Sequence, residues 1–76
     1  MLSYNLTTFD AAEKLINLCR RYKEKMEIDV NWWRYIVDAT SMLGVHSLIG
    51  HIVPLDPQTD DKELFDEFEK DLKEIK

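Results

Sequence analysis

The sequence has few of the residues that interrupt or crosslink a chain: one cysteine, two glycines and two prolines in 76 residues. The single cysteine, Cys19, excludes an internal disulfide framework and is typical of a reducing compartment. The scarcity of glycine and proline argues against a disordered or low-complexity segment. The chain also lacks a run of about 20 apolar residues, which a membrane-spanning helix requires, and it does not begin with the pattern of a secretory signal. These absences predict one cytoplasmic domain over residues 1–76.

Basic residues are in the minority, because 10 Lys and Arg stand against 15 Asp and Glu, which gives a net charge of −5. Nucleic acid binding depends on Lys and Arg that neutralise phosphates, so this charge disfavours a nucleic acid partner. Lys and Arg cluster at residues 20–25, so any basic patch that binds nucleic acid would be confined to that segment. A domain this short buries only about 60% of its unfolded surface, and a deep catalytic cavity would remove packing from its core. We therefore expect a chain that protein partners bind, with no enzyme activity, no cofactor and no metal.

The first third of the chain has the periods of a strand and then a helix. Apolar and polar residues alternate over residues 2–6, as in a half-buried strand. Residues 7–10 indicate a helix start, and Asp10 with Glu13 has the spacing of a capping box. The helix is predicted to end near Lys25. Its apolar stripe consists of Leu15, Leu18, Cys19, Tyr22 and Met26.

The next segment, residues 27–38, is rich in β-branched and aromatic side chains and predicts a hairpin with strands at 28–30 and 34–38. The turn would fall on residues 31–33, where only Asn31 suits a positive φ.

Two adjacent tryptophans lie in this predicted turn. Pleat alternation would place Trp32 and Trp33 on opposite faces, so at least one of them should be exposed. A tryptophan here either caps the open face of the sheet or anchors a partner, since tryptophan is enriched at binding hot spots. The docking hypothesis names Trp32.

Residues 40–48 suit either a buried strand or a short helix with Thr40 or Ser41 as its N-cap. A strand follows at 51–55, where Pro54 is expected at a sheet edge or at the strand's end, because proline lacks a backbone donor.

A predicted loop at 56–59 leads to the last helix, for which Asp60 and Glu63 have capping-box spacing. The apolar stripe of this helix consists of Leu64, Phe65, Phe68, Leu72 and Ile75. The element order β-α-β-β-α-β-α predicts an α+β fold, an open-faced β-sandwich in which a four-stranded antiparallel sheet is covered on one face by three helices.

The run RYIVDATSMLGVHSL, residues 34–48, resembles the HPr proteins of the bacterial sugar phosphotransferase system. In that family a strand leads into a Ser-hydrophobic-Met/Leu-Gly-hydrophobic-x-Ser-Leu motif that opens the second helix, and the motif here covers residues 41–48. The predicted element order is also the order of that family. The resemblance therefore extends over most of the chain and implies an HPr-like fold, but only residues 34–48 match the family specifically.

The resemblance implies a role for each matched residue of the motif. The family's regulatory serine, which a dedicated kinase phosphorylates in many Gram-positive bacteria, falls on Ser41. The exposed apolar docking residues of the family fall on Met42 and Leu43. Gly44 matches the family's glycine, and Ser47 completes the expected docking segment.

The phosphocarrier histidine of the family lies in a Gly-hydrophobic-His-Ala-Arg-Pro run at the start of the first helix. The matching residues here, 7–13, contain no His, Arg or Pro, and without an imidazole nothing accepts the phosphoryl group. The two histidines of the chain, His46 and His51, lie far from this segment in the sequence. Their surroundings favour structural or solvent-facing roles over metal binding.

Three hypotheses follow. The first is a cytoplasmic, non-carrier regulatory or protein-binding module, a monomer or weak homodimer, whose partners include an HPr kinase or a transcriptional regulator. The second is an interaction domain that keeps only the fold, in which Ser41 is simply a helix cap. The third is a surviving phosphocarrier that uses His46 or His51, which would need an exposed imidazole with stabilising donors.

Overall fold

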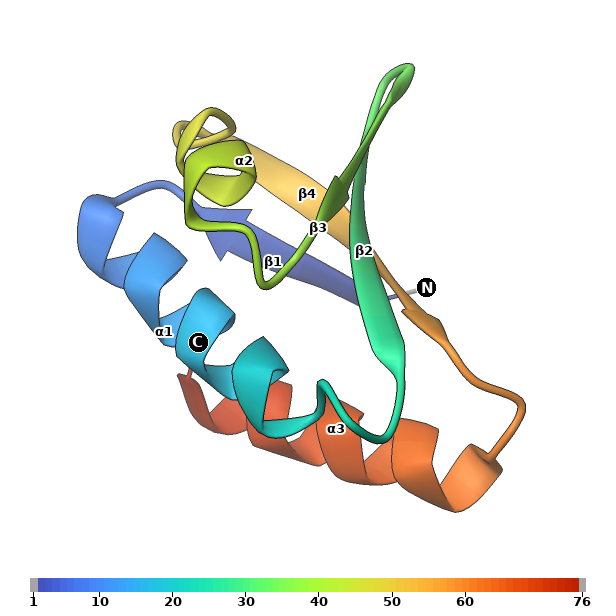
Figure 1. Cartoon of the computed structure of the whole chain (residues 1–76). Helices are drawn as coiled ribbons and strands as arrows, with labels where there is room; N and C mark the ends of the chain where they lie inside the picture. Colours follow the sequence, from blue (N-terminus) through green and yellow to red (C-terminus); the bar gives the residue numbers. More distant parts are fainter. Residues whose placement is uncertain (1, 76) are drawn as a thin grey trace.

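A computed structural model describes residues 2–75, and within this range the chain forms four strands and three helices (Figure 1). The predicted order β-α-β-β-α-β-α and the α+β class are confirmed. The elements are β1 (Leu2–Leu6), α1 (Phe9–Arg21), β2 (Glu27–Trp32), β3 (Tyr35–Asp38), α2 (Met42–His46), β4 (His51–Gln58) and α3 (Lys62–Ile75).

The strands form one antiparallel sheet in the order β1-β4-β2-β3. Alternate residues of β1 are buried and exposed, as the sequence period predicted. The buried residues of the strands share one core cluster with buried residues of all three helices, so the helices cover one face of the sheet and leave the other open. Phe68 of α3 and Leu15 of α1 are fully buried in this cluster, and each such side chain stabilises the fold by about 1.5–3 kcal/mol.

Helix α1 begins at Phe9, within the segment predicted to start it, but its cap is Thr8 and not the Asp10 of the predicted capping box. The Thr8 hydroxyl oxygen accepts a hydrogen bond from the N–H of Ala11 (3.0 Å) and so caps the helix. Asp10 lies inside the first turn, where it forms an ion pair with Lys14 (3.3 Å). An acidic residue in the first turn is favourable because the helix dipole is positive there.

The same helix ends at Arg21, earlier than the predicted Lys25. The N–H groups of Lys25 and Met26 both bond to the carbonyl of Tyr22 (2.9 and 3.0 Å) and form a turn instead. Tyr22 and Met26 remain buried, so the apolar period continues through a turn that is no longer helical.

The hairpin of β2 and β3 turns at Trp33 and Arg34, because Trp32 pairs with Tyr35. The expected turn over residues 31–33 is therefore wrong. Asn31 lies in the ladder, and the positive φ belongs to Trp33 (57°). A bulky residue with positive φ is an outlier that costs about 1–2 kcal/mol.

Strand β4 is internal to the sheet, so the expectation that Pro54 marks a sheet edge or a strand end is wrong. The pairing is staggered: β1 pairs with residues 51–55 and β2 pairs with residues 55–58. Only Leu55 pairs on both sides. Pro54 and Pro57 each lie where β4 has a strand on one side, so a missing N–H can face the unpaired side.

Strand β4 also continues to Gln58, through most of the predicted loop. Helix α3 is capped by Asp61 and not by Asp60, because the Asp61 carboxylate accepts hydrogen bonds from the N–H groups of Glu63 and Leu64 (3.0 and 3.2 Å). Among residues 2–75, no helix is both long and apolar enough to cross a membrane.

Candidate docking surface on α2

The first part of the candidate site is the cap of α2. Ser41 precedes the helix with extended backbone angles, and its Oγ accepts a hydrogen bond from the N–H of Gly44 (3.3 Å). Ser47 follows the helix, and its hydroxyl donates to the carbonyl of Gly44 (2.6 Å). Both serines of the motif therefore bond to the backbone of this short helix and hold its two ends.

Gly44 allows α2 to lie directly against the sheet. A Cβ added at Gly44 would clash with Cγ1 of Val37 on β3 and would also come within 3.3 Å of the Ser41 hydroxyl oxygen. Glycine is unfavourable inside a helix on propensity alone. This close approach between helix and strand is the physical reason for glycine at position 44.

The apolar residues of this segment divide into an anchor and an exposed surface. Val45 and Leu48 are buried in the core and fix α2 on the fold. Leu43 is 87% exposed, and Met42 is also exposed. Large apolar side chains exposed together are typical of interaction sites.

The structure adds Phe9 to this surface, a residue that the sequence did not indicate. The ring of Phe9 lies 4.5 Å from the ring of His46, centroid to centroid. His46 is four residues after Met42 and three after Leu43, so these side chains are neighbours on α2. We use the name α2 surface for the exposed residues Phe9, Met42 and Leu43 with Ser41 at their edge.

Helical spacing groups Phe9 with the buried Ala12 and Ile16 of α1, and so suggests burial, whereas Phe9 is exposed. Only the position of α2 in the fold reveals the contact of Phe9 with His46.

Within the described chain, Nε2 of His46 is buried and has no hydrogen-bond partner.

The two tryptophans lie at the C-terminal end of β2 and in the turn that follows it. Trp33 is 86% exposed, which confirms that at least one of the pair is exposed. They do not lie simply on opposite faces of a pleated strand, because Trp33 is in the turn and its ring approaches that of Trp32 edge-on (6.3 Å). Trp32 is half-buried and stacks on His51 at the start of β4 (4.4 Å), so Trp33 is the more exposed of the two indoles.

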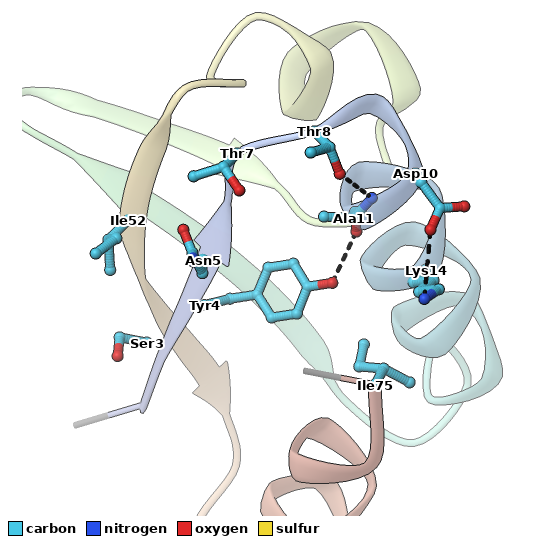
Figure 2. A pocket seen from close by; sticks show the side chains of 10 residues that line it. All are labelled: Ser3, Tyr4, Asn5, Thr7, Thr8, Asp10, Ala11, Lys14, Ile52 and Ile75. Carbon is cyan, nitrogen blue, oxygen red and sulfur yellow. Dashed lines mark hydrogen bonds and ion pairs between the residues drawn. The ribbon is translucent and has the colours of Figure 1, made fainter.

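A cavity of about 530 Å³ lies beside β1 and the start of α1 (Figure 2). The Tyr4 hydroxyl donates to the carbonyl of Ala11 (2.9 Å) at its wall, and the Thr7 and Thr8 side chains face it. This is the segment that the sequence resemblance alone aligned with the phosphocarrier run of the HPr proteins. Neither histidine of the chain lines the cavity.

The remaining reactive groups are dispersed. Cys19 is fully buried, and burial, with a smaller effect of the Asp38 charge, raises the pKa of its thiol to about 12. A thiol with so high a pKa is a poor nucleophile at neutral pH. No group of three or more His, Cys, Asp or Glu side chains that could hold a metal ion occurs among residues 2–75.

The site therefore offers a capped serine beside exposed apolar side chains. This arrangement can bind another protein, and a phosphoryl group on Ser41 would change its charge. No protein-family model, curated protein or solved structure matches this chain. The geometry and the motif are accordingly the basis for a functional proposal.

Proposed function

We propose that this chain is an HPr-like, non-carrier protein-binding module that docks its partners on the α2 surface. The observation that carries the proposal is the exposed pair Met42 and Leu43 directly after Ser41. The element order and the open-faced sheet support the proposed relationship to HPr proteins. The chain would then work by being bound, and it would have no catalytic residues of its own.

Phosphorylation of Ser41 is the proposed regulation of this surface. Ser41 is exposed, and its side chain makes one weak hydrogen bond, to the Gly44 N–H. A phosphoryl group adds about −1.5 to −2 units of charge at pH 7. It would place this charge at the start of α2, where it favours a partner with Arg or Lys and opposes one that is purely apolar.

Incubation with an HPr kinase and ATP, followed by mass spectrometry, tests the proposal. We expect a single phosphate on Ser41 and none in Ser41→Ala. Leu43→Asp should lower the rate of phosphorylation roughly tenfold, the equivalent of losing about 1.4 kcal/mol of docking energy. Ile52→Asp is the matched control, because Ile52 is also an exposed apolar residue but lies on β4.

The outcomes separate the three hypotheses. Absence of phosphate on Ser41 would remove the regulatory role. Equal partner binding by Ser41→Ala and Ser41→Asp would show that the serine is only a cap. An acid-labile phosphate acquired from enzyme I and phosphoenolpyruvate would identify a carrier histidine and refute the non-carrier proposal.

A further inference from the structure

The outer edge of β3 directs backbone groups away from the sheet. β3 is the last strand in the order β1-β4-β2-β3, so within the described chain only β2 pairs with it. The N–H of Ala39 bonds to the carbonyl of Ile28 on β2 (2.9 Å). Residues of an antiparallel strand alternate between bonding to one side and to the other. Val37 therefore also bonds toward β2, whereas Ile36 and Asp38 direct their N–H and C=O groups toward the free edge.

This edge has only part of the usual protection against pairing with another chain, because β3 is short but contains neither lysine nor proline. Lysine, proline, bulges and inward-pointing charges commonly protect edge strands. β3 has the sequence YIVD, and the side chain of Ile36 is 73% exposed. The tip of the hairpin extends beyond the helices (Figure 1), whereas α2 packs against Val37 of β3. The exposed side chains of Tyr35 and Ile36 show that the part of β3 nearer the tip is accessible to a second molecule.

The residues along this edge are complementary to themselves. From Arg34 to Asp38 the chain reads cation, Tyr, Ile, Val, anion. When two copies are placed antiparallel with Ile36 opposite Ile36, each Arg34 lies opposite Asp38 of the other copy. The same register sets outward-bonding residues opposite each other, as an antiparallel ladder requires. Opposite charges at facing positions stabilise such a pair, whereas like charges destabilise it.

Asp38 forms no salt bridge within the described chain, although the positive charge of Lys23 acts on it. Asp38 lies directly opposite Asp29, which also lies opposite Asp56. Hydrogen bonds from the backbone N–H and the hydroxyl of Thr40, with a smaller effect of the Lys23 charge, hold the pKa of Asp38 below its usual value, so it is charged at neutral pH.

We propose that this chain forms a two-fold symmetric dimer by antiparallel pairing of β3 with β3 of a second copy, held in register by two Arg34–Asp38 ion pairs around Ile36. A two-fold axis requires a self-complementary surface, and this edge provides one. The opposite edge, β1, has no charged residue that could set such a register. The pairing uses no residue of the α2 surface, so it is independent of the proposed function.

The dimer should be weak, because two short strands form an interface at the small end of the range for protein pairs. We expect a Kd on the order of 100 µM. Sedimentation velocity should therefore show the average mass rising toward that of a dimer between about 10 µM and about 1 mM protein.

A single substitution and a matched control locate the interface. Ile36→Lys places a charge at the centre of the edge and should keep the protein monomeric over the whole concentration range. Ile52→Lys makes the same change at an isoleucine that is 64% exposed on β4 and should leave dimerisation unchanged. A monomeric wild type at about 1 mM, or an Ile36→Lys variant that dimerises like wild type, would overturn the proposal.

A complementation experiment tests the register. Arg34→Glu alone and Asp38→Lys alone each bring like charges together and should be monomeric. In a mixture, every facing pair of the heterodimer has opposite charges, so the two variants should associate with each other. Circular dichroism first checks that each is folded, because Asp38 also bonds to Thr40. Failure of two folded variants to associate would exclude this register, and if Asp38→Lys does not fold, the Ile36→Lys comparison alone decides.

Discussion

Substitution of Gly44 by alanine sets helix propensity against packing, and the structure decides which effect is larger. Alanine is more favourable than glycine inside a helix by about 1 kcal/mol. The new Cβ, however, would overlap Cγ1 of Val37. Val37 has a stiff, β-branched side chain, and overpacking of this kind costs about 1–3 kcal/mol. Because the overlap is deep, we take the upper end and expect Gly44→Ala to lower the free energy of unfolding by about 2 kcal/mol.

Thermal and urea unfolding measure this effect. A loss of about 2 kcal/mol corresponds to a decrease in Tm of roughly 10 °C for a chain of this size. Val37→Ala removes the clashing methyl, so the double variant should recover most of the loss that Gly44→Ala causes. Gly50→Ala is a contrasting control, because Gly50 has a φ of 108° and no atom within 4 Å of an added Cβ, and Val37→Ala should not rescue it. A Gly44→Ala protein as stable as wild type, or additive effects in the double variant, would refute the reasoning.

Three further predictions concern titratable groups. Tyr22→Phe removes the hydrogen bond that the Tyr22 hydroxyl donates to Asp71 (2.5 Å), which links α1 to α3, so the free energy of unfolding in urea should fall by about 1 kcal/mol. Burial, with the charges of Asp38, Glu27 and Asp56, raises the pKa of Asp29 above its unfolded value, so its ionised form destabilises the fold at neutral pH and this cost disappears as the pH falls through the raised pKa. The substitution Asp29→Asn should therefore raise the midpoint of urea unfolding at pH 7, and this increase should become smaller toward pH 3. Cys19, with a pKa of about 12, should resist iodoacetamide at pH 8 in the native protein and react once the protein is unfolded, as mass spectrometry can show.

Local periodicity predicted the elements of this fold because it reports which face of each segment is buried. Alternation located β1 at its observed bounds, and the stripes of α1 and α3 correspond to residues that pack in the core. Helix ends were less predictable, since several residues can cap. Thr8 and Asp10 are both good caps by type, and the chain path into α1 selects Thr8.

Features that depend on distant partners could not be predicted in the same way. The position of Pro54 is tolerated because β1 and β2 pair with different halves of β4, and no local pattern encodes that stagger. Residues 40–48 suited either a buried strand or a short helix capped by Thr40 or Ser41, and the structure contains the helix with Ser41 as its cap. The local pattern could not indicate Phe9, which reaches this surface only through the packing of α1 beside α2.

The exposed indole of Trp33 at the hairpin tip also allows binding to be followed by intrinsic tryptophan fluorescence. The side chain of Trp33 is almost fully exposed to solvent, whereas that of Trp32 is stacked on the imidazole of His51 and partly buried. Emission from Trp33 should therefore lie at longer wavelength and be quenched more readily by iodide than emission from Trp32. A molecule that covers the hairpin tip would shift the emission of Trp33 to shorter wavelength and protect it from iodide. Binding at this end of the sheet could thus be followed in solution without a label.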